Sequence, residues 1–321
     1  MEEPGFQDYA ALRSLDDGKV VRGRDGWLFL DNDANDVFRQ HSGELRLSDE
    51  QLEGWRAVLE ERISWLEERG SAYFFLVPPN PHSVYPEKLP PGTRTAAERP
   101  IHQLIRHLSE HSFASAIYPL EALLAEKEQR PVYPSNSSHW NAAGGFVAYT
   151  VLMREMSSAV EARVLSWGDV VFWNHEWVSD LGAKLSPNEV ATQTGAGIRK
   201  GRPTIVSDNE IWGNGRLRVY ECHDAPDATC LLLGDSFSYP FMVFLAASFR
   251  RLVFAHIPTL DRELVAEASP DVVVSLLNER FLVEVPTDAA APSLRAWEQQ
   301  KRERGETVAA MQALRAEPEA R

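Results

Sequence analysis

Cysteine and long apolar runs are scarce in this 321-residue sequence, and each scarcity excludes a class of protein. Only Cys222 and Cys230 occur, so disulfides are not the basis of stability. No stretch reaches the roughly 18 apolar residues that a membrane span requires. The first residues lack the basic and apolar segments of a signal peptide, which predicts a cytoplasmic protein. A periplasmic or extracellular location stays open if the sequence is part of a longer chain.

Basic residues are fewer than acidic ones: 33 Lys and Arg against 47 Asp and Glu give a formal net charge of −14. Nucleic acids and anionic membrane surfaces are bound through basic patches, so neither is expected as the main partner. The sequence also lacks a P-loop, a Gly-x-Gly-x-x-Gly after a strand, a Cys-x-x-Cys and histidines at metal-ligand spacing. We therefore predict no metal and no other cofactor. A hydrophobic content of 44% remains, enough for a sizeable globular core.

Strand and helix patterns alternate along most of the chain. Residues 48–69 carry apolar side chains at helical spacing, and Ser48 with Gln51 forms a capping-box pattern. Further helices are expected at 96–109, 120–128, 142–156, 238–249 and 260–268, and strands at 72–77, 114–118, 229–233, 251–255 and 271–277. This alternation predicts an α/β fold, with a doubly wound, mostly parallel sheet flanked by helices.

Three parts of the chain are expected: an N-terminal arm over residues 1–20, a main domain over 21–285, and a C-terminal helix and tail over 286–321. The terminal helix is predicted at about 292–315. Within the main domain, residues 163–226 are rich in tryptophan and glycine without a regular pattern, which predicts an irregular insertion. Its tryptophans, among them Trp177 and Trp212, either stack on sugar rings or form a local core.

An apolar run ends at Gly234-Asp235-Ser236, directly before a helical pattern. Ser236 is thereby exposed at the carboxyl end of a buried strand, beside the free N–H groups of a helix start. An acyl-transfer nucleophile needs these surroundings. The alternative is that the serine only caps the helix. Asn278 follows another strand, and the carboxyl edge of a doubly wound sheet brings both residues to one crevice.

A second segment, residues 133–141, supplies a base. It reads Tyr-Pro-Ser-Asn-Ser-Ser-His-Trp-Asn and precedes an Ala- and Gly-rich helical pattern. His139 is the candidate general base. Its neighbour Trp140 either packs beneath the imidazole or contacts substrate, and Asn141 is expected to cap the helix.

Together the two segments resemble the alginate O-acetyltransferase family with an SGNH-hydrolase-like domain. Members of that family carry Asp-x-His-Trp well before Gly-Asp-Ser-Phe. Residues 23–30, 77–90 and 270–280 are similar to the family as well, so the resemblance spans roughly residues 20–285. It implies a permuted SGNH-hydrolase-like fold.

The resemblance also implies a function, a carbohydrate O-acyltransferase that transfers acetyl through an acyl-Ser236 intermediate. In it Gly234 and Asp235 shape the turn, and Asn278 contributes its side chain to the oxyanion hole. The expected substrate-binding residues are Trp140, Asn80 and Arg280, the last of which has an ion pair with Glu279 or Asp235 as its alternative use.

The expected partners are a carbohydrate acceptor, an acyl donor and, as one option, a membrane protein that delivers the acyl group. Two alternative functions stay open. One is a carbohydrate esterase that uses the same serine and histidine. The other is a non-catalytic glycan-binding or scaffold protein.

One position departs from the family pattern. Ser137 stands where the family has aspartate, and no acidic residue lies between Arg130 and His139. Such a carboxylate orients the imidazole and stabilises the imidazolium, and its loss from a serine protease costs about 10⁴ in rate. Three explanations stay open: a Ser236–His139 dyad oriented by Ser137 or Asn136, a carboxylate supplied from elsewhere in the fold, or a degenerate site that binds without turnover.

Overall fold

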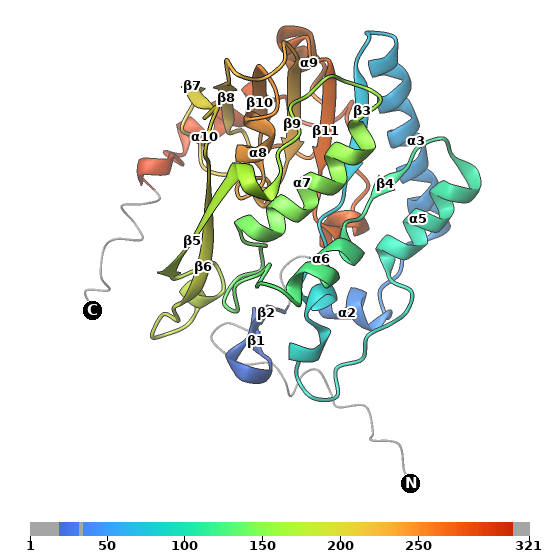
Figure 1. The fold of residues 1–321 in the computed structure, drawn as a ribbon. Coiled ribbons are helices and arrows are strands. Elements are labelled where there is room, and N and C mark those ends of the chain that lie inside the picture. Colours follow the sequence, from blue (N-terminus) through green and yellow to red (C-terminus); the bar gives the residue numbers. More distant parts are fainter. Residues whose placement is uncertain (1–18, 32–34, 311–321) are drawn as a thin grey trace.

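The computed structural model describes residues 19–31 and 35–310, and its centre is a seven-stranded sheet of order β4-β3-β11-β9-β10-β8-β7 (Figure 1). Five strands run parallel; at one edge β8 pairs antiparallel with β10, and β7 pairs antiparallel with β8. The α/β prediction is confirmed. The strand bounds are β3 (Ala72–Leu76), β4 (Ala116–Ile117), β7 (Thr204–Asp208), β8 (Leu217–Glu221), β9 (Thr229–Gly234), β10 (Arg251–Ala255) and β11 (Val272–Leu276).

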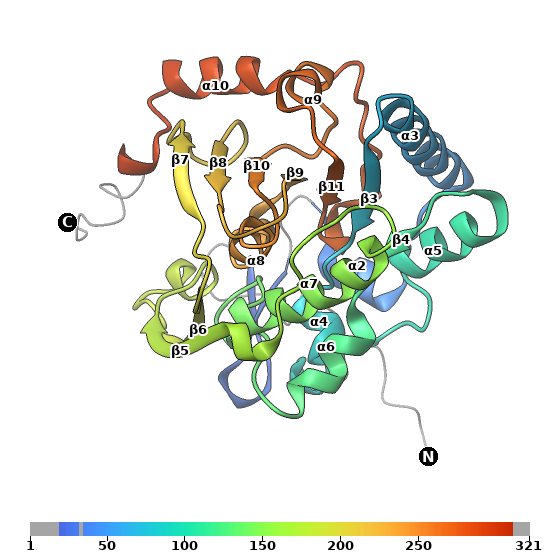
Figure 2. The same cartoon turned by 45° about the horizontal axis from the view of Figure 1, so that its top comes forward.

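Helices cover both faces of this sheet (Figure 2). One face carries α3 (Asp49–Glu67), α5 (Pro100–His111), α9 (Arg262–Ala268) and α10 (Leu294–Glu303). The other carries α6 (Leu120–Lys127), α7 (Ala142–Met156) and α8 (Met242–Ala246). Smaller elements are the hairpin of β1 (Val20–Arg22) and β2 (Leu28–Leu30), α2 (Val37–Ser42) and α4 (Pro81–Val84).

The sequence pattern explains this layering. Ser48 caps α3 in the predicted capping box, and the buried stripe of the helix, which includes Trp55 and Leu59, packs toward the sheet. Side chains of the central strands alternate between faces, so that Leu232 belongs to the cluster under α7 while its neighbour Leu231 belongs to the cluster under α9. The central strands β9 and β11 are therefore buried on both sides, as expected for parallel strands.

Some predicted elements differ from the structure. Within residues 163–226, β5 (Val170–Trp177) and β6 (Ala191–Ile198) form a separate hairpin, but β7 and β8 belong to the central sheet. The helix expected at 238–249 is divided into a 3₁₀ turn, η5 (Ser236–Ser238), and α8, because Pro240 interrupts the helical hydrogen bonds. The terminal helix is shorter than predicted, since α10 ends at Glu303.

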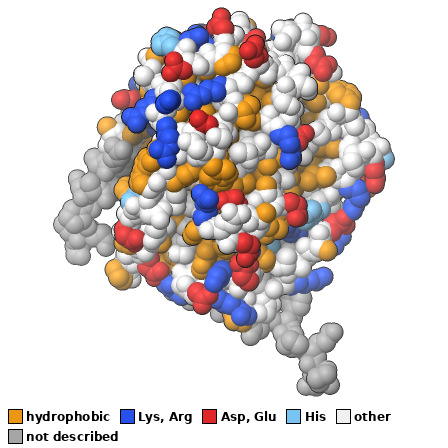
Figure 3. Space-filling view, viewed as in Figure 1, with side chains coloured by type: hydrophobic (Ala, Val, Ile, Leu, Met, Phe, Trp, Pro, Cys, Tyr) orange, Lys and Arg blue, Asp and Glu red, His pale blue; other side chains and the backbone are white. Residues whose placement is uncertain are grey.

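Parts of the predicted arm and tail, residues 1–18 and 311–321, lie outside the described residues. Over the ranges 19–31 and 35–310, no helix is both long and apolar enough to cross a membrane. On the face shown in Figure 3, acidic and basic side chains are interspersed around a band of apolar ones.

A buried ion pair fixes the C-terminal segment against α3. Arg62 is 2% exposed, and its Nε and Nη2 atoms each donate a hydrogen bond of 2.7 Å to the Asp288 carboxylate. Asp288 Oδ1 also accepts a hydrogen bond from the Leu260 backbone N–H at 2.9 Å, and Arg62 donates to Pro258 O at 3.2 Å. The pair therefore holds the loop after β10, which borders the candidate site.

We predict that Asp288→Asn lowers the free energy of unfolding by about 3 kcal/mol, because it leaves the buried Arg62 charge uncompensated. Urea unfolding measures this change. The matched control is Glu61→Gln, which removes the exposed partner of Arg262 and should change the free energy by less than about 0.5 kcal/mol. Equal effects of the two substitutions would contradict the assigned role of the buried pair.

Candidate active site

Ser236 lies at the carboxyl edge of the sheet, two residues after β9 ends. Asp235 shapes the turn, because its Oδ1 accepts from Phe237 N and its Oδ2 from Asn278 N, both at 2.8 Å. Burial raises the pKa of this carboxyl, although both N–H donors oppose the shift. Gly234 is required by space, since a Cβ there would lie 2.2 Å from Ser238 Oγ.

His139 reaches the serine because α7 begins directly against the Ser236 turn. Asn141 caps the helix, and its side chain accepts from Gly144 N at 3.0 Å. A Cβ on Gly145 would come within 2.9 Å of Pro240 O, so glycine permits the close approach of helix and turn. As a result His139 Nε2 lies 2.6 Å from Ser236 Oγ, within hydrogen-bonding distance.

Asp180 supplies a carboxylate on the other side of the imidazole. Its Oδ2 lies 3.5 Å from His139 Nδ1. The same carboxylate accepts from Ser137 Oγ at 2.8 Å, Ser138 N at 3.0 Å and Ser138 Oγ at 2.5 Å. Ser138 Oγ in turn lies 3.2 Å from His139 Nδ1. Three consecutive residues therefore converge on one acidic side chain.

The loop that carries Asp180 follows β5 and is attached to the histidine segment through Asn136. The Asn136 side chain donates to Trp177 O and Glu189 O, each at 3.0 Å. Its backbone carbonyl accepts from Leu181 N and Gly182 N at 3.2 and 3.1 Å. These four bonds flank Asp180 on both sides and fix its position relative to His139.

The environment of Asp180 favours its ionised form. Burial alone would raise its pKa, but the positive charge of His139 and hydrogen bonds from His139, Ser138 and Ser137 outweigh it and hold the pKa well below its usual range. About a third of the side chain is exposed. The carboxylate is therefore negatively charged at neutral pH.

The expected oxyanion role of Asn278 has no support in the structure. Asn278 is fully buried, and its amide donates to Pro78 O at 3.0 Å and Pro79 O at 3.4 Å. Its Oδ1 accepts from Arg280 N at 3.2 Å. The amide N–H groups hydrogen-bond the end of β11 to the end of β3, so they are not directed at Ser236.

Three residues expected to contact substrate are instead buried. Trp140 is fully buried beneath the turn, and its Nε1 donates to Phe237 O at 2.9 Å. Arg280 is 5% exposed, lies over the rings of Phe237 and Phe281, and donates to Asn80 Oδ1 at 3.3 Å. These side chains support the turn and the loop after β3, and their burial gives no support to the prediction that they bind substrate.

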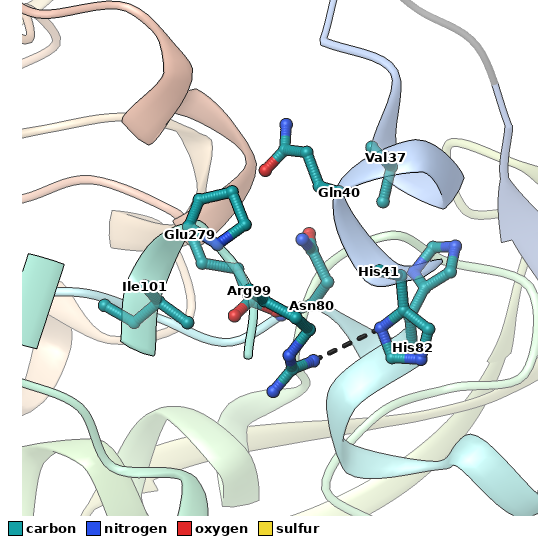
Figure 4. Close-up of a pocket in the computed structure, with 9 residues that line it drawn as sticks. Val37, Gln40, His41, Asn80, His82, Arg99, Ile101 and Glu279 are labelled. Atoms are coloured by element: carbon teal, nitrogen blue, oxygen red, sulfur yellow. Dashed lines mark hydrogen bonds between the residues drawn. The ribbon is translucent and has the colours of Figure 1, made fainter. Parts of the chain in front are cut away.

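Asn80 borders a small pocket with Glu279, Arg99 and His41 (Figure 4). Glu279 accepts from Asn80 N at 2.7 Å and from the Tyr118 hydroxyl at 2.7 Å. Arg99 Nη1 lies 3.2 Å from His41 Nδ1. Glu279 is thus hydrogen-bonded to residues that follow β3 and β4. Among the described residues, Arg280 forms no ion pair with Glu279 or with Asp235.

A pocket of about 420 Å³ opens beside Ser236. Its walls come from the ends of β10 and β11 and from the loop before β8, and include His256, Asn214, Leu277, Phe281 and Val285. Such a volume is typical of small-molecule sites. Residues 19–31 and 35–310 contain no cluster of three or more His, Cys, Asp or Glu side chains that could hold a metal ion.

Comparison with known proteins identifies the fold and the family. Residues 20–257 match the family model described as SGNH hydrolase-like domain, acetyltransferase AlgX. The chain belongs to this family. The order of motifs in its sequence, His-Trp followed by Gly-Asp-Ser-Phe, thus identified the family correctly. A search of curated protein sequences gives no match.

Solved structures agree with the AlgX-family fold. PatB1 of Bacillus cereus has a TM-score of 0.62 at 16% identity, with 82% of this chain and 96% of that chain covered. The O-acetyltransferase domain of Pseudomonas putida AlgJ has a TM-score of 0.58 at 17% identity, with 89% and 99% covered. A DHHW family protein of Eubacterium siraeum gives 0.54 at 14% identity, with 83% and 91% covered. At these identities the likeness shows the fold alone.

In this AlgX-family chain, the acidic side chain beside His139 was missed by sequence reasoning. Asp180 lies 41 residues after the histidine, in a loop that the sequence shows only as irregular. The one available signal is indirect: Ser137 and Ser138 are two adjacent hydroxyl donors without an acidic partner nearby in sequence. Ser236, His139 and Asp180 are the side chains that the fold brings together.

We predict that Asp180→Asn destabilises the protein mainly above about pH 4. A depressed folded-state pKa stabilises the fold above the unfolded value of about 3.9, and this contribution is lost as the pH falls toward the folded pKa. Urea unfolding between about pH 3 and pH 7 should show a gap between wild type and variant that narrows at the acidic end. Asp227→Asn, which alters a fully exposed carboxyl, is the control. A gap that is constant with pH would contradict the assignment.

Proposed function

We propose that the protein is a carbohydrate O-acyltransferase that transfers acetyl through an acyl-Ser236 intermediate. The observation that supports it most is the contact of 2.6 Å between His139 Nε2 and Ser236 Oγ, backed by Asp180 at His139 Nδ1. A nucleophile, a base and an orienting acid then lie in the order and at the spacing that acyl transfer requires. Membership of an acetyltransferase family agrees with acetyl as the acyl group.

The proposed reaction has two steps. In the first, His139 Nε2 accepts the Ser236 hydroxyl proton while Oγ bonds to the acyl carbon of the donor. The donor's bond to that carbon breaks, and its leaving group takes the proton from His139. In the second, a sugar hydroxyl gives its proton to His139 and attacks the acyl carbon, the Oγ–carbon bond breaks, and Ser236 recovers the proton.

Asp180 takes the role that the family pattern gives to position 137. Its negative charge would hold the Nδ1–H tautomer of His139 and stabilise the imidazolium in both steps. Ser137 and Ser138 then act on Asp180 by hydrogen bonding rather than on the imidazole alone. Of the three explanations for the missing aspartate, this supports a carboxylate supplied from elsewhere in the fold.

The acceptor would approach over the β5–β6 hairpin. Trp177 ends β5, is 58% exposed and lies three residues before Asp180. Trp173 on the same strand is 49% exposed. Exposed indole rings beside a site are suited to stacking on pyranose rings. Trp167, by contrast, packs between Phe146 and Phe172 at ring distances of 4.7 and 5.3 Å and belongs to the core.

We predict that wild-type protein gains one acetyl group from 4-nitrophenyl acetate and that Ser236→Ala gains none, because the alanine has no nucleophile. Intact-mass spectrometry measures the label. Ser135→Ala, a half-buried serine in the histidine segment, is the control and should be labelled like wild type. Labelling of Ser236→Ala, or none of wild type, would refute the proposal. Release of the acetyl group to water alone, with no transfer to any glycan, would favour the esterase alternative.

We predict that Asp180→Asn lowers kcat by about 10²- to 10⁴-fold, since it removes the charge that stabilises the His139 imidazolium. Ser137→Ala should lose about tenfold or less, the effect of one hydrogen bond to the carboxylate. Steady-state hydrolysis of an activated ester at neutral pH compares the two. Equal losses, or no loss in Asp180→Asn, would point back to a Ser236–His139 dyad without an acid.

A further inference from the structure

His256 borders the same pocket as Ser236 but has no part in the chemistry described so far. It directly follows β10, whose Ala255 pairs with Leu233 of β9, so His256 lies level with Gly234 across the strands. Its backbone is fixed on both sides, because His256 N donates to Arg216 O at 2.8 Å and Gly215 N donates to His256 O at 3.0 Å. The ring is therefore held at the carboxyl edge beside the serine turn.

The imidazole lies on the face of the sheet that carries His139. Side chains two residues apart on a strand share a face, and Phe254 belongs to the cluster under α7 and α8. Ring centroids of Phe254 and His256 are 6.2 Å apart, and Tyr239 is close to both, at 5.6 and 5.8 Å. His256 thus approaches Ser236 from the β10 side, whereas Asn278 approaches from the β11 side with its amide already used.

A hydrogen bond to Tyr239 orients the ring. The Tyr239 hydroxyl lies 3.2 Å from His256 Nδ1. The positively charged guanidinium of buried Arg216 acts on the same hydroxyl, and a guanidinium only donates. The tyrosine oxygen therefore faces a cation, and its own proton is available to Nδ1. With Nδ1 accepting, a neutral imidazole carries its proton on Nε2, for which the described part of the chain shows no partner.

The charges around His256 keep it neutral. Burial and the positive charges of Arg216, His139 and Lys301 lower its pKa to about 4. A neutral Nε2–H next to a nucleophile is a donor without a competing acid function, the kind of group that stabilises a developing oxyanion.

We propose that His256 is an oxyanion donor for the acyl transfer at Ser236, with Tyr239 and Arg216 as the positioning residues that fix its Nε2–H tautomer. The donor lies on the β10 side of the serine, in place of the Asn278 amide that joins β3 to β11. This inference rests on the proposed acyl-serine chemistry, and it assigns a role to the polar groups on the β10 side of the pocket.

Two variants of His256 separate a donor from a packing residue. His256→Leu keeps the bulk but removes the N–H, and it should lower kcat for acylation by 4-nitrophenyl acetate by about 10²-fold with little change in KM. His256→Gln retains an N–H near the Nε2 position and should recover most of that loss. Tyr239→Phe should lose about two- to tenfold, the worth of one neutral hydrogen bond. His111→Leu, at an exposed position of α5, is the control.

Imidazole ¹⁵N NMR of the wild-type protein provides a readout that does not depend on turnover. We expect His256 to be neutral with its proton on Nε2, and Tyr239→Phe to weaken that preference. A proton on Nδ1, or wild-type kcat in a folded His256→Leu variant, would overturn the inference. If wild type is not acetylated at all, the acyl-serine proposal fails, and the oxyanion role of His256 fails with it. If wild type is acetylated and His256→Leu reacts equally well, only the present inference fails.

Discussion

The Asp180 carboxylate is the group on which the geometry of the site depends. It contacts three consecutive residues, Ser137, Ser138 and His139, and thereby fixes the loop before α7 to the loop after β5. Without that negative charge, the donors of these three residues would lose their shared acceptor. The same contact that orders the two loops also orients the imidazole toward Ser236, so local folding and the alignment of His139 with Ser236 have one physical cause.

The carboxyl edge of the sheet supplies the rest of the arrangement. Ser236 follows β9, Asn278 follows β11 and His256 follows β10, so the parallel strands bring all three to the same edge of the sheet. Each is used differently. Asn278 donates to the Pro78 and Pro79 carbonyls on the β11 side, whereas His256 lines the pocket on the β10 side of the serine.

Much of the fold was predictable because its signals are local. Capping by Ser48, the buried stripe of α3, and the apolar strands before Gly234 follow from periodicity and turn chemistry. Ser236 and His139 are recognisable for the same reason, since each adjoins a turn or a helix start. Asp180 and the use of the Asn278 amide depend on contacts between segments 41 and about 200 residues apart, and no local pattern contains that information.

The most direct test of this account moves the charge back to position 137. Ser137→Asp in the wild-type background should reduce esterase activity, because a second carboxylate would be forced against Asp180. The same substitution in an Asp180→Asn background should raise activity by tenfold or more, about 1.4 kcal/mol of transition-state stabilisation. Opposite signs in the two backgrounds are the predicted result. A rise in the wild-type background, with no gain in the Asp180→Asn background, would contradict the assignment of Asp180 as the acid.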